Sequence, residues 1–166
     1  MPLLPLPMTI YIRHAEPRDA TGWTAMRVAL WPDESEAGHA AEVARFFDRG
    51  AIESRALLPE ATLVAANQDG EIETLVGFAE LSRRPYAEGC VTSPVGFLEG
   101  WYVAPGYRGR GVGRALVRAA EAWARDLGCR EFASDTQLEN TGSAAAHRAL
   151  GFEEVEVIRC FRKDLQ

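Results

Sequence analysis

The stretch FLEGWYVAPGYRGRGVG, residues 97–113, decides the fold, because a strand, a glycine-rich turn and the start of a helix follow one another in it. The apolar run from Phe97 to Val103 predicts a strand, which Ala104-Pro105-Gly106 ends. A turn dense in arginine and glycine follows, and the next residues carry an apolar face at helical spacing as far as Gly128. A strand that leads through glycines into a helix N-terminus presents backbone N–H groups, which bind anions.

Outside this stretch, apolar spacing predicts elements in the order strand, helix, helix, strand, strand, strand, helix, strand, helix, strand. The strands are expected at residues 9–13, 61–67, 74–81, 97–103, 131–136 and 155–161. The helices are expected between Pro17 and Pro32, at 36–49, from 113 to 127, and at 143–150. A polar turn at 68–71 joins the second and third strands as a hairpin. The sequence therefore predicts an α/β (α+β) fold.

Length and composition limit the class of protein. With 166 residues, 47% of them hydrophobic, the chain can bury one core, and we expect a single domain at residues 9–166. Residues 1–8 carry three prolines and are expected to form a disordered tail, with Met8 as an alternative start. No apolar run approaches the roughly 20 residues of a membrane span, so we expect no membrane partner.

Charge and cysteine content point to a cytoplasmic protein that binds a small cation. The net charge of −6 and the pI near 5.1 argue against a nucleic-acid partner and favour a cationic small molecule. The three cysteines form no CxxC pair, which favours reduced thiols over a disulfide framework or a zinc site. We therefore expect a cytoplasmic location and no metal.

The glycine-rich turn does not match the commoner phosphate-binding loops. Gly106 and Gly111 have the spacing of a Walker A loop, but Val112-Gly113 stand where Lys and Ser or Thr are needed. A dinucleotide fingerprint requires GxGxxG in an N-terminal βαβ unit, whereas Gly109, Gly111 and Gly113 are spaced GxGxG in mid-chain. An anion site built from backbone N–H groups and a turn without a ligand both stay open on spacing alone.

Two motifs resemble those of the GNAT superfamily of N-acetyltransferases. The run Arg108-Gly109-Arg110-Gly111-Val112-Gly113 resembles that superfamily's pyrophosphate loop for acetyl-CoA. The later residues Asn140, Ser143, His147 and Leu150-Gly151-Phe152 resemble its second motif. More narrowly, several segments resemble the aminoglycoside 6'-N-acetyltransferases, which modify antibiotics and form homodimers: residues 30–32, 86–90, 97–100, 128–131 and 150–154.

The resemblance implies a GNAT fold, with a central mixed, mostly antiparallel, twisted sheet of about six or seven strands, one splayed pair of strands, and about four flanking helices. It implies acetyl-CoA as cosubstrate and direct transfer of acetyl to the 6'-amino group of an aminoglycoside in a ternary complex, which confers resistance. It also implies a homodimer. The residues that would bind the cofactor are Trp101, Val103, Arg108, Gly109, Arg110, Gly111, Val112, Gly113 and Asn140.

Two carboxylates and one histidine are the predicted catalytic residues. Glu99 interrupts an apolar run, where a carboxylate is costly if unpaired; the resemblance implies that it binds the ammonium and relays its proton. Asp135 would be a second acidic contact, and His147 stands where many members have a tyrosine acid. The structural alternatives are an exposed strand glutamate, an aspartate that caps a turn, and a packed histidine.

The resemblance also places Trp31, Tyr86 and Glu156 against the substrate, beside Glu99 and Asp135. Aromatic packing is the alternative for the two rings, and solvated surface is the alternative for the glutamate. Asn140 is also a good helix N-cap. Two other functions stay open: acetylation of another amine, such as a polyamine, a protein N-terminus or a lysine, and a non-catalytic module that binds acyl-CoA.

Overall fold

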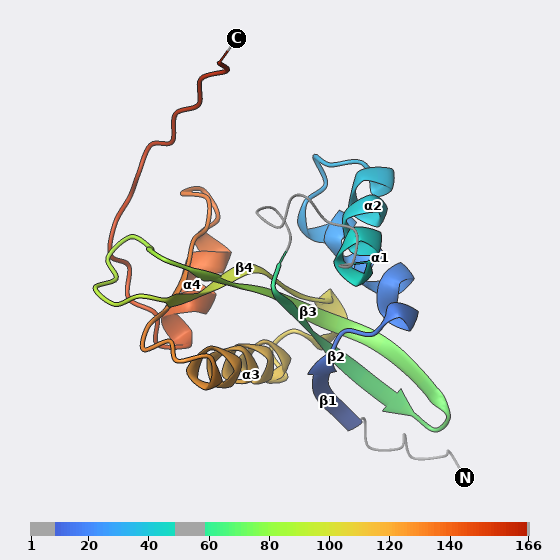
Figure 1. The fold of residues 1–166 in the computed structure, drawn as a ribbon. Coiled ribbons are helices and arrows are strands. Elements are labelled where there is room, and N and C mark those ends of the chain that lie inside the picture. Colours follow the sequence, from blue (N-terminus) through green and yellow to red (C-terminus); the bar gives the residue numbers. More distant parts are fainter. Residues whose placement is uncertain (1–8, 49–58, 166) are drawn as a thin grey trace.

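The computed structural model describes residues 9–48 and 59–165, and its strands form one twisted sheet in the order β1-β2-β3-β4-β5 (Figure 1). The first four strands are antiparallel neighbours, and β5 is parallel to β4. The bounds are Thr9–His14 for β1, Ala61–Asp69 for β2, Ile72–Arg84 for β3, Val95–Val103 for β4 and Phe132–Ser134 for β5. The mixed, mostly antiparallel sheet is confirmed, but the described part of the chain has five strands instead of six or seven.

All four helices lie where the sequence predicts them. Their bounds are Ala20–Leu30 for α1, Glu36–Phe47 for α2, Val112–Asp126 for α3 and Thr141–Ala149 for α4. The Ser35 side chain caps α2 by accepting a hydrogen bond from the backbone of Gly38. The predicted end of the second helix near Gly50 and the predicted tail at residues 1–8 lie outside the described residues. None of the helices described is long and apolar enough to cross a membrane.

The hairpin of β2 and β3 turns at Gly70-Glu71, and Gly70 has a φ of 61°, a conformation that glycine adopts without strain. Strand β3 continues three residues beyond the predicted end at Leu81, because residues 82–84 pair with residues 95–97 of β4. The alternation of apolar residues had already stopped there, so the sequence predicted a loop. The extension matters for the site, because it adds Ser82 and Arg84 to the sheet.

The helices cover the two faces of the sheet separately (Figure 1). Helix α3 buries Leu116 and Val117 against one face, in a cluster that includes Leu98 of β4. Helices α1 and α2 pack on the other face, where Trp23 and Phe78 are fully buried. Strand β4 therefore has an α3 side and an α1 side, and the predicted site residues of this strand divide between these two sides.

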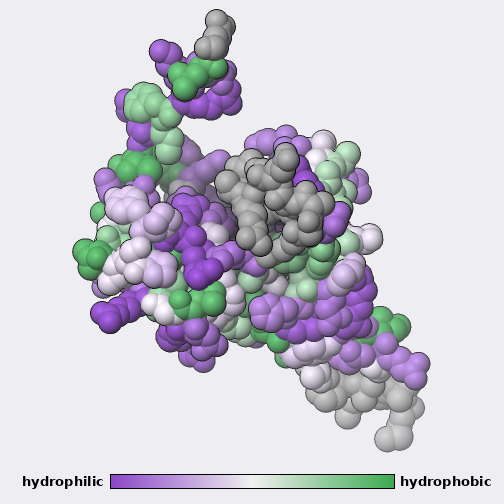
Figure 2. Space-filling model, in the orientation of Figure 1, coloured by the Kyte–Doolittle hydropathy of each residue, from purple (hydrophilic) through white to green (hydrophobic). Residues whose placement is uncertain are grey.

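The predicted final strand at residues 155–161 is wrong for the single chain. Residues 152–165 form no helix or strand. Phe152 still packs on the core and Val155 lies against Gly89, and the later part of this C-terminal segment leads away from the body (Figure 1). Val155, Val157 and Phe161 have strand-like spacing, yet they are 62%, 63% and 88% exposed. Figure 2 shows hydrophobic and hydrophilic residues mixed along the protruding segment. Spacing alone makes no strand, since backbone N–H and C=O groups need a neighbouring strand to pair with.

Candidate active site

Glu99 lies at a β-bulge in β4. Glu80 of β3 pairs with Gly100, and the next residue, Leu81, pairs with Leu98, so Glu99 has no partner opposite it. The extra residue changes the side to which the following residues point. Leu98 packs on the α3 side, whereas Gly100 lies under the ring of a tryptophan from the end of α1. Alternation from Leu98 already places Glu99 on the α1 side, and the bulge keeps Gly100 on that same side.

Glu99 is ion-paired, not isolated. The Ser82 hydroxyl donates to its Oε1, and Arg84 donates from Nε to Oε1 at 3.1 Å and from Nη2 to Oε2 at 2.6 Å. The side chains of Arg84 and Glu99 are 36% and 29% exposed. Glu99 is therefore not the unpaired, desolvated carboxylate that its apolar neighbours in the sequence suggest. The sequence analysis missed Ser82 and Arg84, because only the register between β3 and β4 brings these alternate positions to Glu99.

Strands β4 and β5 separate immediately after Leu98, which is the last β4 residue in register with β5. The Ser134 hydroxyl donates to the Leu98 carbonyl at 3.1 Å and lies 2.9 Å from Nε2 of His147. His147 Nδ1 lies 2.8 Å from the carbonyl oxygen of Ser143. The imidazole ring also packs edge-on against Trp101, with ring centroids 5.5 Å apart. Both ring nitrogens of His147 thus have hydrogen-bond partners. His147 therefore connects α4 to the point where β4 and β5 separate, which we call the fork.

The edge of β4 beyond this fork has no neighbouring strand within the described residues. Its residues from Gly100 to Val103 pair with β3 and with no other strand of the described part of the chain, as expected for a strand that receives an extended ligand. The indole N–H of Trp101 is buried and has no hydrogen-bond partner among the described residues. The Val103 carbonyl already accepts a hydrogen bond from Arg108 Nε at 2.8 Å, which holds the glycine-rich turn against the strand end.

The N-terminus of α3 is suited to an anion. The first intrahelical bond runs from Ala115 N to the Gly111 carbonyl at 2.9 Å, so the three preceding N–H groups have no partner within the helix. No side chain caps this end, and its first turn holds no acidic residue. Gly109 and Gly111 have φ values of 72° and 84°, and a side chain on either would meet no atom within 4 Å. The exposed Arg108 and Arg110 add positive charge beside the N–H groups.

Two residues of the glycine motif serve packing as well. Val112 is buried in the core under α3. A Cβ on Gly113 would lie 2.8 Å from Cζ2 of Trp101, so only glycine lets the first turn of α3 approach β4 this closely. The sequence analysis assigned Gly113 to the anion alone. This contact places the anion-binding turn against β4, two residues beyond Glu99.

Trp31, at the C-terminal end of α1, lies over Gly100. Its ring stacks on His39 with centroids 6.3 Å apart, and the guanidinium of Arg27 lies 4.9 Å from the ring centroid. His39 Nε2 lies 3.0 Å from the Trp31 carbonyl oxygen. These contacts place Trp31 next to Glu99 on the α1 side of the strand, as a substrate contact would require.

A buried polar network below Trp31 supports it. Arg27 pairs with Glu80 of β3 and with Glu42 of α2, and the Trp23 indole donates to Glu80 at 2.9 Å. Burial raises the pKa of Glu80, and the positive charge of Arg27 opposes that rise. Removing one member would leave a buried charge without its partner. The network therefore fixes α1 and Trp31 to the sheet, and nothing in the sequence analysis pointed to it.

Four other predicted residues lie outside this arrangement or have structural partners. Asp135 is exposed, directly after β5, and Tyr86 is 62% exposed in the loop between β3 and β4. Asn140 caps α4, since its Oδ1 accepts a hydrogen bond from the backbone of Ser143 at 3.0 Å. Glu156 is exposed on the C-terminal segment, and the single chain does not bring it to Glu99.

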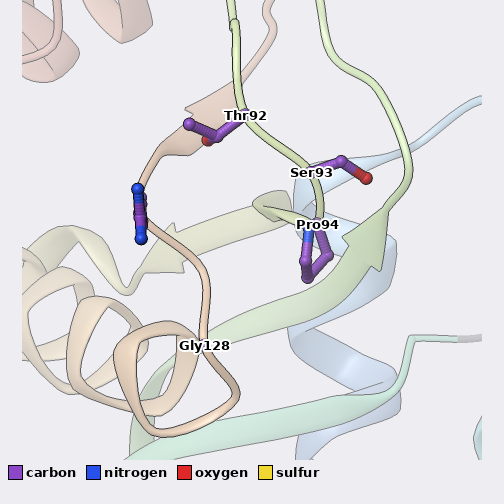
Figure 3. Close-up of a pocket in the computed structure, with 5 residues that line it drawn as sticks. Thr92, Ser93, Pro94 and Gly128 are labelled. Atoms are coloured by element: carbon purple, nitrogen blue, oxygen red, sulfur yellow. The ribbon is translucent and has the colours of Figure 1, made fainter.

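A hollow of about 330 Å³ lies elsewhere, between the β3–β4 loop and the turn at the end of α3. Figure 3 shows Thr92, Ser93 and Pro94 on one side of it, near Gly128. Arg130 completes the lining, and no predicted site residue is part of it. We therefore locate the site from the chemistry of β4 and α3, not from the volume of this hollow. Among the described residues, no group of three or more His, Cys, Asp or Glu side chains could hold a metal ion.

Comparisons with known proteins agree with this geometry. Residues 23–152 match the model of the acetyltransferase (GNAT) family. An aminoglycoside N(6')-acetyltransferase type 1 from Klebsiella aerogenes is 52% identical over 154 residues, which are 93% of this chain and 96% of that protein. A protein of the same name from Stenotrophomonas maltophilia is 47% identical over 156 residues, covering 93% of this chain and 94% of that protein.

Solved structures give the same result. The aminoglycoside N-acetyltransferase AAC(6')-Iy in complex with CoA has a TM-score of 0.83 and 38% identity, covering 98% of this chain and 100% of that chain. AAC(6')-Iy in complex with the bisubstrate analogue CoA-S-monomethyl-acetylneamine has a TM-score of 0.78 and 35% identity, covering 95% and 99%. The chain therefore belongs to the acetyltransferase (GNAT) family, and within that family it is similar to the aminoglycoside 6'-N-acetyltransferases.

Proposed function

We propose that the protein transfers the acetyl group of acetyl-CoA to the 6'-amino group of an aminoglycoside, by direct attack in a ternary complex. The observation that carries this proposal is the position of Glu99. Alternation from Leu98 places its carboxylate on the α1 side, two residues before Trp101, whose ring contacts the glycine-rich turn of α3 on the other side. A cation site and an anion site thus share one short piece of strand, as acetyl transfer between a cationic amine and CoA requires.

In this proposal the CoA pyrophosphate binds the first backbone N–H groups of α3, beside Arg108 and Arg110. The pantetheine arm lies along the edge of β4 beyond Leu98 and bonds its backbone groups. A backbone N–H near Trp101 polarises the thioester carbonyl and stabilises the developing oxyanion. The relative that binds CoA is similar to this chain over nearly its whole length, which supports the same cosubstrate here.

The amine must lose a proton before it attacks, because aliphatic amines with pKa values of about 8–10 are mostly protonated at pH 7. Glu99 binds the ammonium and passes one proton to solvent, with Asp135 as a second acidic contact. The neutral nitrogen then attacks the thioester carbonyl, the C–S bond breaks, and CoA leaves as a thiolate. The nitrogen loses its second proton to water or to that thiolate, which leaves the neutral amide. A thiol pKa of about 8.5 makes this leaving group acceptable without a dedicated acid. His147, with both nitrogens engaged, therefore positions the fork in our scheme.

Thiol release on mixing acetyl-CoA with kanamycin- or tobramycin-like amines tests the proposal. We expect release with the wild type and a large loss with Glu99→Gln plus Asp135→Asn, while CoA binding stays intact. Spermidine and peptides at equal concentration test the acetylation of other amines, and the aminoglycosides should be clearly preferred. If no amine supports release, the chain is a non-catalytic module that binds acyl-CoA, and the proposal fails.

We further propose that the protein is a cytoplasmic homodimer that confers aminoglycoside resistance on its host. The exposed apolar residues of the C-terminal segment support dimerisation, because a strand-like segment without a neighbour is a surface that a second copy can pair with. The free thiols of Cys90, Cys129 and Cys160 agree with a reducing compartment. A monomeric mass at micromolar concentration would contradict the dimer, and unchanged drug susceptibility on expression would contradict the resistance.

A further inference from the structure

Glu99, the residue on which the proposed function depends most, already binds a cation from its own chain. The planar guanidinium of Arg84 grips both carboxylate oxygens, and the Ser82 hydroxyl adds a third bond. The guanidinium of Arg84 also lies over the ring of Phe97, with its central carbon 3.4 Å from the ring centroid. The guanidinium is therefore held in a definite place, against the carboxylate that a substrate ammonium has to reach.

We propose that Arg84 is an internal cation of the amine site, which a substrate ammonium must displace from Glu99 in order to bind. The inference rests on the proposed function, because it assumes that Glu99 is the amine contact. Arg84 would then lower the affinity for every cationic amine and so set how strongly charged a substrate must be. No other feature of the reaction requires an arginine at this position.

Displacement is physically accessible. A carboxylate can accept about four hydrogen bonds. Two cations bound to the same carboxylate repel each other, so an arriving ammonium competes with Arg84 for Glu99. Arg84 is the last residue of β3 and its side chain is 36% exposed, so its guanidinium can leave Glu99 and the Phe97 ring and move into water. Partly exposed ion pairs are weak, and removing this one should tighten amine binding by about fivefold.

The neighbouring residue provides a matched control. Arg83 is also on β3 and also pairs with a glutamate, since its Nη2 lies 2.6 Å from Oε1 of Glu60. Successive strand residues point to opposite faces, so Arg83 and Glu60 do not share the face of Glu99. Arg83→Gln removes the same charge and the same kind of ion pair next to Arg84, without touching the amine site.

The test is calorimetric titration of a kanamycin-like amine into the full-length protein at low ionic strength, with steady-state KM values for the amine and for acetyl-CoA. Arg84→Gln should tighten amine binding and lower the amine KM by about fivefold, with the acetyl-CoA KM unchanged. Arg84→Lys keeps the charge but cannot grip both oxygens, so it should give a smaller gain. It also serves as the second test if Arg84→Gln does not fold. Arg83→Gln should match the wild type.

The results of these titrations distinguish a failure of the internal-cation role of Arg84 from a failure of the proposed acetyltransferase function. Unchanged or weaker amine binding by the Arg84 variants, in a protein that acetylates the amine, overturns the internal-cation role and leaves the acetyltransferase assignment standing. Equal gains from Arg83→Gln would show a general charge effect and would also overturn it. If neither the wild type nor Arg84→Gln binds or acetylates any amine, both proposals fall together.

Discussion

The substitution Gly100→Ala should displace Trp31 from its place beside Glu99. A Cβ on Gly100 would lie 2.7 Å from Cζ2 of Trp31 and closer still to Cη2, well inside the 3.4 Å at which ordinary contact begins. The backbone itself accepts alanine, since the φ of Gly100 is not positive. The ring therefore has to move by roughly 1 Å, against its stacking on His39 and its contact with Arg27.

Overpacking of this kind costs about 1–3 kcal/mol, which corresponds to a fall in Tm of roughly 2–12 °C for a chain of this size. Thermal unfolding measures the stability, and initial rates give the KM for the amine, which should rise severalfold while the KM for acetyl-CoA changes little. Gly106→Ala is the matched control, because a Cβ there would meet no atom within 4 Å.

The double variant Gly100→Ala plus Trp31→Phe isolates the contact. The smaller phenylalanine ring lacks the atoms that clash, so the two changes together should cost clearly less than the sum of the single changes. A Gly100→Ala protein as stable as the wild type would refute the placement of Trp31 over Gly100. Additive costs in the double variant would refute it as well.

Three further substitutions test other parts of the structure. Gly111→Val puts a branched side chain where φ is 84° and beside the α3 N–H groups, so CoA affinity should fall at least about tenfold; unchanged affinity by calorimetry would mean that the anion binds elsewhere. Glu80→Ala removes the buried partner of Arg27, leaving its guanidinium paired with the partly exposed Glu42 and the Trp23 indole without its acceptor. It should lower the unfolding free energy by about 3–5 kcal/mol in urea titrations. The Tyr11 hydroxyl and the Arg13 guanidinium lower the pKa of Glu73 below its ordinary 4.5, so its contribution to stability is present above that pH and is lost as the pH falls through the lowered value. Glu73→Gln should therefore be less stable near neutrality and show a flatter loss of stability below pH 4.5; an unchanged acid transition would contradict the linkage.

Local patterns predicted the elements that depend on short-range interactions. The hairpin at Gly70 and the four helices follow from turn chemistry, caps and apolar spacing, all of which act within a few residues. The final strand failed for the opposite reason. Val155 and Val157 have the right spacing, but a strand exists only beside another strand, and residues 9–48 and 59–165 of the single chain supply none there.

Residues 97–113 show the same difference between features that local sequence predicts and features that only the folded chain reveals. Their glycines and arginines predicted a turn between a strand and a helix, and the family resemblance then favoured an anion site there and selected Glu99. Residue chemistry and conformational freedom are local properties, so a motif can be read from them. The β4 bulge, the pairing of Glu99 with Arg84 and the contact of Gly113 with Trp101 became visible only in the folded chain. These features depend on the register between strands and on which surfaces meet, and long-range packing decides both.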